Sequence, residues 1–141
     1  MKIVTYNING IRAATKFGLL EWIEKEDADI YCFQEVRANE DKTREIFKDG
    51  LQQTLFFDKK ESLLDKFQKI YNCGKIPGYA GTMILSKHSP SLIKYDMDKF
   101  WTDNEGRTTT IIFEAQKLAI VNAYIPNGNS RLEFKMKYLD A

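Results

Sequence analysis

The stretch IVTYNINGIRAATKFGLLEWIEKEDADIYCFQE, residues 3–35, decides the fold. It opens with an apolar, β-branched run at 3–6 that leads into Asn and Gly residues, as a strand followed by a loop does. Apolar residues then recur at helical spacing from Phe17 to Ile23. The run IYCF at 30–33 is apolar without alternation, which is typical of a strand buried on both faces. A strand, a helix and a buried strand predict a βαβ unit, in which functional loops follow the carboxyl ends of the strands.

The rest of the chain continues this mixture of helices and strands. Before Pro77 the pattern predicts a short helix at 41–48, a strand at 52–57 and a helix with a basic side at 58–75. From Pro77 onward, apolar runs separated by turn residues predict an antiparallel meander of strands at 79–85, 92–95, 108–113 and 118–124. A helix is predicted after them, at 131–139. We therefore predict an α/β layered sheet.

Length and composition describe one soluble globular domain. The 141 residues are 43% apolar and 13% aromatic, which is enough for a hydrophobic core and argues against a disordered chain. No apolar run approaches the roughly 18 residues of a membrane span, and the N-terminus lacks the apolar stretch of a secretory signal. We therefore expect a cytoplasmic protein that does not contact membranes. Because the net charge is only +1, any binding of nucleic acid requires a local concentration of positive charge.

Three polar residues lie where predicted strands end: Asn7 after the first, Glu35 after the second and Tyr124 at the end of the last. Strand ends on one edge of a sheet converge in space, so these side chains could share one cleft. A carboxylate in such a place suits Mg²⁺, which favours one or two carboxylates together with water and phosphate oxygens. Each residue also has an ordinary interpretation, as a solvated strand cap, a turn asparagine and a packing tyrosine respectively. Position in the sequence alone leaves both interpretations open.

Short motifs in a fixed order along nearly the whole chain connect these residues. They are YNINGIRA at 6–13, DI and FQE within 29–35, GYAGT at 78–82, LSK at 85–87, EGR at 105–107, NAYIPN at 122–127 and RLE at 131–133. With these motifs the chain resembles the exonuclease III type of AP endonuclease, within the endonuclease/exonuclease/phosphatase superfamily. The resemblance implies that residues 1–141 are the N-terminal portion of a single domain. The implied fold is α/β, part of a four-layered sandwich whose C-terminal half is missing.

The resemblance also implies a role for each matching residue. Glu35 falls on the family's metal-binding glutamate, and Asn7 on the asparagine that helps to arrange metal, catalytic water and phosphate. Tyr124 falls on the active-site tyrosine beside the scissile phosphate. The implied cofactor is Mg²⁺, with Mn²⁺ as the alternative ion. Positions that hold the DNA backbone through phenol, guanidinium and amide groups carry Tyr79, Arg107, Asn127 and Arg131. Asn9 stands where some members have an acidic residue, which implies weaker metal coordination there.

The activity that the resemblance implies belongs to DNA repair. Such an enzyme hydrolyses the phosphodiester 5′ to an abasic site with Mg²⁺ and also acts as a 3′-to-5′ exodeoxyribonuclease. The expected partner is double-stranded DNA that contains abasic sites. The expected location is the cytoplasm, with association with the nucleoid when the protein is bound to DNA.

Two departures from the family pattern qualify this expectation. The segment 58–75 is longer than the usual connection, and its lysines suggest either a phosphate-tracking surface or a solvated helix face. The family's G-D-x-N and S-D-H motifs, which supply the general base and an Asp–His pair, do not occur in the chain. We therefore expect the chain to be inactive alone and to have a complementary C-terminal half as a partner, because the helix at 131–139 looks cut rather than capped.

Two alternative functions follow from the same residues. One is a non-enzymatic DNA-binding module or half of a split enzyme. The other is a phosphodiesterase or phosphatase of the same superfamily that acts on another substrate.

Overall fold

The computed structural model of the protein describes residues 1–54, 63–76, 78–97 and 104–141. The strands in this part of the chain are β1 (Ile3–Asn7), β2 (Ile30–Gln34), β3 (Gln68–Asn72), β4 (Thr82–Ser86), β5 (Leu92–Tyr95), β6 (Thr108–Phe113) and β7 (Leu118–Ala123). The α-helices are α1 (Ile11–Lys16), α2 (Leu19–Glu26), α3 (Glu40–Thr54) and α4 (Leu132–Leu139).

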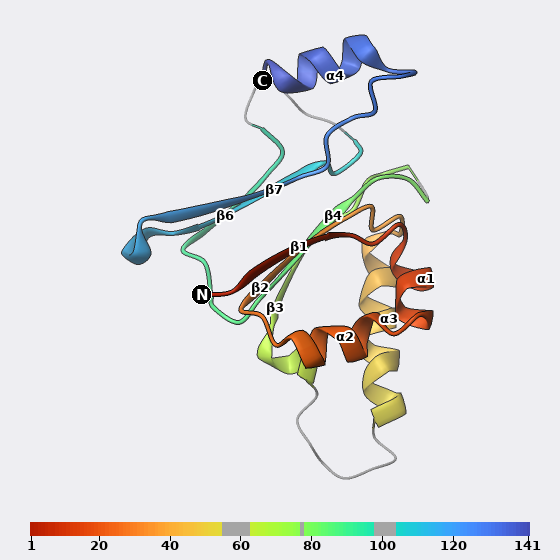
Figure 1. Ribbon diagram of the computed structural model, residues 1–141, viewed down its shortest axis with the longest axis vertical. Coiled ribbons are helices and arrows are strands. Elements are labelled where there is room, and N and C mark those ends of the chain that lie inside the picture. Colours follow the sequence, from red (N-terminus) through yellow and green to blue (C-terminus); the bar gives the residue numbers. More distant parts are fainter. Residues whose placement is uncertain (55–62, 77, 98–103) are drawn as a thin grey trace.

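The first sheet has the strand order β1-β2-β4-β3. β1 and β2 run parallel, with Asn7 opposite Gln34, whereas β4 runs antiparallel to both of its neighbours. The helices α1, α2 and α3 cover one face of this sheet (Figure 1). Tyr31 and Phe33 of the buried strand β2 share a hydrophobic core there with Ile23 of α2. The predicted βαβ unit is confirmed, because α1 and α2 connect two parallel, neighbouring strands.

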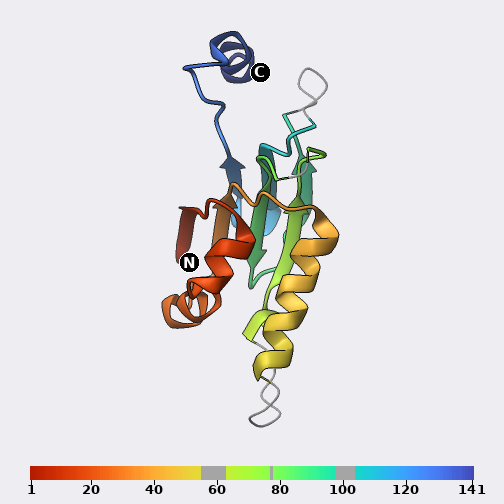
Figure 2. The ribbon, with the colours of Figure 1, turned by 90° about the vertical axis from the view of Figure 1, so that its right-hand side faces the viewer.

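The second sheet is antiparallel, with the order β5-β6-β7, and it packs on the other face of the first sheet. Ile30 and Ile84 of the first sheet are buried against Ile111 and Phe113 of the second. Figures 1 and 2 show helices, first sheet and second sheet as successive layers, with α4 beyond the upper ends of the sheets. The predicted α/β class is confirmed, and these layers agree with part of a four-layered sandwich.

A buried polar side chain joins the two sheets. Asn122 of β7 is 1% exposed, and its Nδ2 donates to the carbonyl oxygens of Phe33 at 3.0 Å and Met83 at 3.1 Å. Its Oδ1 accepts a hydrogen bond from Gln34 Nε2 at 2.7 Å. Both hydrogens and the oxygen of this amide are therefore satisfied by the first sheet, which is the condition for burying it at little cost.

The predicted helix at 58–75 is wrong over the residues that the structure describes. A short 3₁₀ turn at Leu63–Lys66 is followed by strand β3. Phe67 and Tyr71 pack into the core under the helices, whereas Ile70 packs between the sheets. The apolar residues that mimic one helical face are therefore divided between the two faces of an extended segment, because successive side chains of a strand point to opposite sides.

Two further predictions are corrected in part. Residues 52–54, predicted as the start of a strand, end helix α3, whose leucine and glutamines are good helix formers; residues 55–57 lie outside the described part. The antiparallel meander is confirmed for β5, β6 and β7, but β4 belongs to the first sheet, between β2 and β3. None of the described helices has the length and apolar character that crossing a membrane requires.

Candidate active site

The ends of three strands meet at one point. Asn7 is the last residue of β1, Glu35 comes directly after β2, and Tyr124 directly after β7. Asn7 Nδ2 donates to Glu35 Oε1 at 2.8 Å, and the Tyr124 hydroxyl donates to the same carboxylate. The structure therefore brings together the three residues that the sequence predicts for metal binding and catalysis.

The backbone after β2 holds Glu35 in an unusual conformation. Its φ of 57° lies in the left-handed region, which turns the chain sharply at the end of the strand. Two residues later the amide of Arg37 donates to the carbonyl of Ala80 at 2.9 Å. The loop that carries Glu35 is thereby fixed against the GYAGT segment that carries Tyr79.

The carboxylate of Glu35 is largely buried but well compensated. Its side chain is 13% exposed, and Arg37 Nη2 lies 2.5 Å from Oε2. Burial alone would raise the pKa of Glu35, but the hydrogen bonds from Asn7 and Tyr124 and the charge of Arg37 outweigh it. The pKa of this carboxyl therefore lies below its ordinary value, and the group is ionised at neutral pH.

Replacing Asn7 with alanine is expected to raise the pKa of Glu35. The variant loses a hydrogen bond to the ionised carboxylate, while burial, which favours the neutral form, remains. A pKa that is lower in the folded than in the unfolded chain stabilises the fold above the unfolded value of 4.5. That contribution is lost as the pH falls through the folded pKa, so the variant should lose it at a higher pH than the wild type.

Carbon NMR titration of the Glu35 carboxyl and acid unfolding followed by circular dichroism measure these two effects. Glu133 is the internal control, because its pKa is lowered by a hydrogen bond from Lys137 on α4 and should not change. A Glu35 pKa that is the same in both proteins would contradict the role given to Asn7.

Tyr124 is a neutral phenol in this environment. Its partial burial, the hydrogen bond to Glu35 and the negative charge of that carboxylate raise its pKa above the ordinary value. The guanidinium of Arg107 lies over its ring, 4.7 Å from the centroid, and donates to its carbonyl oxygen at 2.9 Å. Tyr124 is therefore suited to donate a hydrogen bond rather than to act as a base.

A second cluster adjoins Tyr124 and contains three of the four predicted phosphate-binding residues. The buried carboxylate of Glu105 pairs with Arg107 and with Arg131, at 2.8 Å from Arg131 Nη1. Both arginines donate to the hydroxyl oxygen of Tyr79, at 3.2 Å and 3.0 Å. Tyr79, Arg107 and Arg131 thus form one hydrogen-bonded unit around Glu105, which the sequence analysis includes in a motif without assigning it a role.

The predicted phosphate-binding residues differ in how open they are to a ligand. Arg107 has a side chain that is only 1% exposed, so it supports the tyrosines around it from inside the fold. Arg131 is 31% exposed, and Tyr79 is also partly exposed. Asn127 lies in the exposed loop after β7, where its Oδ1 accepts the amide of Asn129 at 2.8 Å. Contact of these residues with phosphate stays a prediction.

A basic hollow of about 400 Å³ adjoins the site through Arg37, which lines the hollow and pairs with Glu35. Among the described residues, four cationic side chains, no acidic ones and three glycines line it. The cations are Arg12, Arg37, Lys42 and Lys75. They supply the local positive charge that a chain of net charge +1 requires in order to bind a polyanion. Sequence analysis missed this group, although Arg12 lies within the YNINGIRA motif and Arg37 follows Glu35 by two residues.

The residues around Glu35 fit a divalent cation that is shared with a substrate. The described part of the chain contains no cluster of three or more His, Cys, Asp or Glu side chains that would enclose a metal. Glu35 Oε2, however, is buried and faces only the ion-pair partner Arg37 among the described residues, in a geometry that is not that of a hydrogen bond. Mg²⁺ commonly takes one or two protein carboxylates and completes its shell with water and phosphate oxygens. Glu35, oriented by Asn7, matches that requirement.

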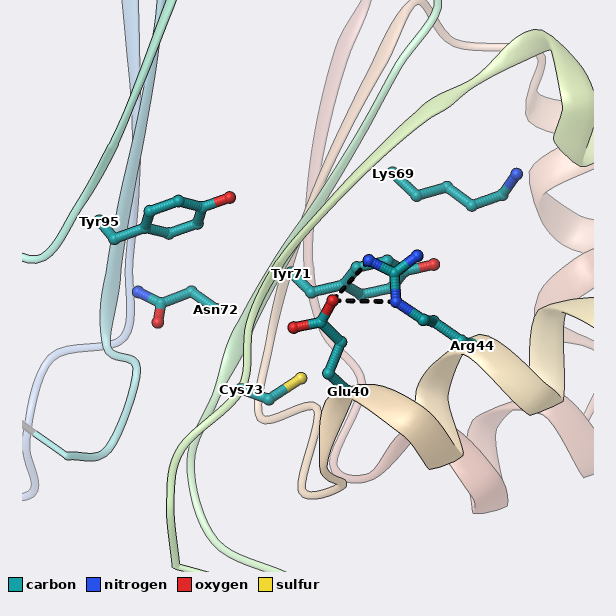
Figure 3. A pocket seen from close by; sticks show the side chains of 7 residues that line it. All are labelled: Glu40, Arg44, Lys69, Tyr71, Asn72, Cys73 and Tyr95. Carbon is teal, nitrogen blue, oxygen red and sulfur yellow. Dashed lines mark hydrogen bonds and ion pairs between the residues drawn. The ribbon is translucent and has the colours of Figure 1, made fainter.

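A hollow of about 340 Å³ at the β3 edge of the first sheet is separate from this site (Figure 3). Arg44 there pairs with Glu40 and lies over the ring of Tyr71, 4.8 Å from the centroid. Burial raises the pKa of the Cys73 thiol to about 11, so this cysteine is a poor nucleophile. We assign no chemistry to this hollow.

Comparison with known proteins identifies the family of this chain. The chain matches the endonuclease/exonuclease/phosphatase family over residues 4–140. It is 30% identical over 144 residues to a DNA-(apurinic or apyrimidinic site) endonuclease of Dictyostelium discoideum, with 99% of this chain and 35% of the relative covered. It is 29% identical over 145 residues to an exodeoxyribonuclease of Bacillus subtilis (strain 168), with 100% of this chain and 50% of the relative covered.

A solved structure shows the same fold. An AP endonuclease from Archaeoglobus fulgidus superposes with a TM-score of 0.73 at 20% identity, covering 99% of this chain and 48% of that chain. The chain therefore spans about half the length, or less, of the proteins that it matches, as the sequence analysis predicts. From the match along nearly all of its residues, the chain belongs to the endonuclease/exonuclease/phosphatase family.

Proposed function

We propose that this chain takes part in DNA repair as a portion of a Mg²⁺-dependent AP endonuclease. That enzyme hydrolyses the phosphodiester 5′ to an abasic site and has associated 3′-to-5′ exodeoxyribonuclease activity. The observation that carries the proposal is the meeting of Glu35, Asn7 and Tyr124 next to two groups of basic side chains. Two relatives of the chain, one named as an AP endonuclease and one as an exodeoxyribonuclease, support the choice of DNA as substrate.

In this proposal the chain's own residues bind and orient the phosphodiester. When substrate binds, Tyr124, a neutral phenol, turns its one hydrogen from the Glu35 carboxylate to a phosphate oxygen whose negative charge grows in the transition state. Glu35 would hold Mg²⁺, or Mn²⁺ in its place, and the bound ion supplies positive charge to the phosphate. Asn7 keeps the carboxylate in position. The basic hollow and the Tyr79 and Arg131 side chains hold the neighbouring phosphates.

The general base comes from elsewhere in this proposal. The described residues form no cluster of three or more His, Cys, Asp or Glu side chains from which a base could be drawn to deprotonate a water molecule. The carboxylate of Glu35 itself is held by Asn7, Tyr124 and Arg37. We therefore propose that residues outside this sequence, corresponding to the remaining length of the relatives, supply the base, whether they belong to the same polypeptide or to another. The chain alone should bind DNA without cutting it.

The test compares binding with incision on a DNA duplex that carries a stable abasic-site analogue. We expect fluorescence anisotropy to show binding by this chain, with an affinity that falls steeply between about 50 and about 200 mM salt. Gel electrophoresis should show no incision with Mg²⁺. Incision by the chain alone that disappears in Glu35→Gln would contradict the need for a complementary half.

Other nucleic acids and a phosphoinositide test the substrate class. Tighter binding of an RNA duplex or a phosphoinositide than of the abasic duplex would favour a different phosphodiester or phosphomonoester substrate. No binding of any nucleic acid at low salt would contradict the proposed function altogether. The cytoplasmic location, with association with the nucleoid, belongs to this proposal and stays a prediction.

A further inference from the structure

We propose that Glu105 is a positioning residue whose carboxylate holds Tyr79 and Arg131 in the arrangement that binds a DNA phosphate. The proposal rests on the proposed function, because it concerns the same DNA-binding surface. The proposal predicts an effect on DNA affinity of opposite sign to the usual effect of a negative charge. A carboxylate near a polyanion ordinarily weakens binding through repulsion, whereas this carboxylate should strengthen it.

Both oxygens of Glu105 are engaged by arginines. Oε1 accepts a hydrogen bond from Arg131 Nη1 at 2.8 Å, and Oε2 accepts one from Arg107 Nε. The Glu105 side chain is only 9% exposed, so it is removed from water and depends on these two cations. The ion pairs fix the directions of two guanidinium planes, which a neutral side chain of the same shape would hold less firmly.

The two arginines in turn orient the phenol of Tyr79. The phenolic oxygen accepts from Arg107 Nη2 at 3.2 Å and from Arg131 Nη1 at 3.0 Å. Since such an oxygen has two lone pairs and one hydrogen, these bonds occupy its acceptor positions and leave its hydrogen as a donor. Tyr79 is 38% exposed, so this donor can meet a phosphate oxygen that arrives from solvent.

Glu105 is also fixed to both elements that it connects. Its carbonyl accepts the amide of Gly81, two residues after Tyr79, at 2.9 Å. Arg131 stands at the start of α4, and Tyr138 of that helix is hydrogen-bonded to β6 at 2.6 Å. If the carboxylate is lost, the long Arg131 side chain regains rotamer freedom between two fixed elements. Ordering it again on DNA then costs free energy.

The test measures DNA affinity in two variants that lose the same charge. Glu105→Gln should weaken binding of the abasic-site duplex about tenfold and reduce the slope of log affinity against log salt by about one. Glu133→Gln is the matched control, because its carboxylate lies on α4, the helix that begins directly after Arg131, is 84% exposed and pairs with Lys137. The control should bind as tightly as the wild type or slightly tighter.

Circular dichroism and thermal unfolding establish that each variant is folded. If Glu105→Gln does not fold, Glu105→Asp replaces it, because the shorter side chain keeps the buried negative charge but reaches less far toward the two arginines. This variant should still weaken DNA binding several-fold. A folded variant that binds as tightly as the wild type, or tighter, overturns the positioning role. A wild-type chain that binds no DNA contradicts the proposed function instead and removes this proposal with it.

A double-mutant cycle distinguishes positioning of Arg131 by Glu105 from a general loosening of the fold in the Glu105 variant. If Glu105 acts through Arg131, adding Glu105→Gln to an Arg131→Gln variant should change DNA affinity little. If the fold-losses of DNA affinity in the two single variants multiply in the double variant, Glu105 does not act through Arg131.

Discussion

Replacing Arg107 with methionine is expected to destabilise the chain by about 3–5 kcal/mol, because it removes one partner of a buried ion pair. The Arg107 side chain is 1% exposed, and its guanidinium lies against Glu105 and over the rings of Tyr124 and Phe134. Methionine fills part of the same space. It leaves the buried Glu105 carboxylate without Arg107 and removes the donor to the Tyr124 carbonyl.

Urea unfolding measures this loss, with Arg131→Met as the comparison. Arg131 pairs with the same carboxylate, but its side chain is 31% exposed, so water can replace part of what is lost. Its substitution should cost about 1 kcal/mol. Equal losses of unfolding free energy in the two variants would contradict the view that burial makes Arg107 contribute more to stability than Arg131. The Arg107 variant should also bind DNA more weakly, since Tyr79 loses one of its two donors.

Replacing Gly106 with alanine is expected to cost about 4 kcal/mol or more, which would leave much of the chain unfolded. Gly106 has a φ of +63°, and an added Cβ would lie 2.2 Å from the carbonyl oxygen of Asn72. That oxygen belongs to strand β3, so relief requires the strand or the loop to move. The loop in question carries Glu105 and Arg107 on either side of the glycine.

Gly78→Ala is the matched control for backbone strain without a clash. Gly78 also has a positive φ, +74°, but an added Cβ would meet no atom of the described residues within 4 Å. This variant should lose only about 1 kcal/mol. Thermal unfolding followed by circular dichroism gives the midpoint of each variant. Similar midpoints would show that the clash with β3 does not determine the loss of stability.

The meeting of Asn7 and Glu35 is predictable because strand ends can be read from the sequence. The unbroken apolar run of β2 marks it as a buried central strand, and Glu35 follows its last residue. Parallel pairing then brings the end of β1 beside it. The sequence could not show that Tyr124 reaches the same point from the second sheet. That placement depends on how two separately formed sheets pack.

The basic hollow is not predictable in the same way. Its cations come from separate segments, and one of them, Lys75, follows a strand that the periodicity misassigns as a helix. Arg107 shows a further limit of sequence reading. A motif identifies the residue type, but exposure depends on packing, and here the arginine is enclosed by Glu105 and aromatic rings. In the structure Arg107 supports Tyr79 from inside the fold, and its contact with phosphate stays a prediction.

Asn122 has a consequence for the site that reaches beyond its burial. Glu35 and Tyr124 belong to different sheets, so their separation would change if one sheet slid over the other. The Asn122 amide binds both β2 and β4, and it stands two residues before Tyr124, while its partner Gln34 stands one residue before Glu35. Asn122 therefore prevents the two sheets from sliding past each other. The alignment of the Glu35 carboxylate with the Tyr124 phenol thus depends on a buried side chain outside the substrate-binding surface.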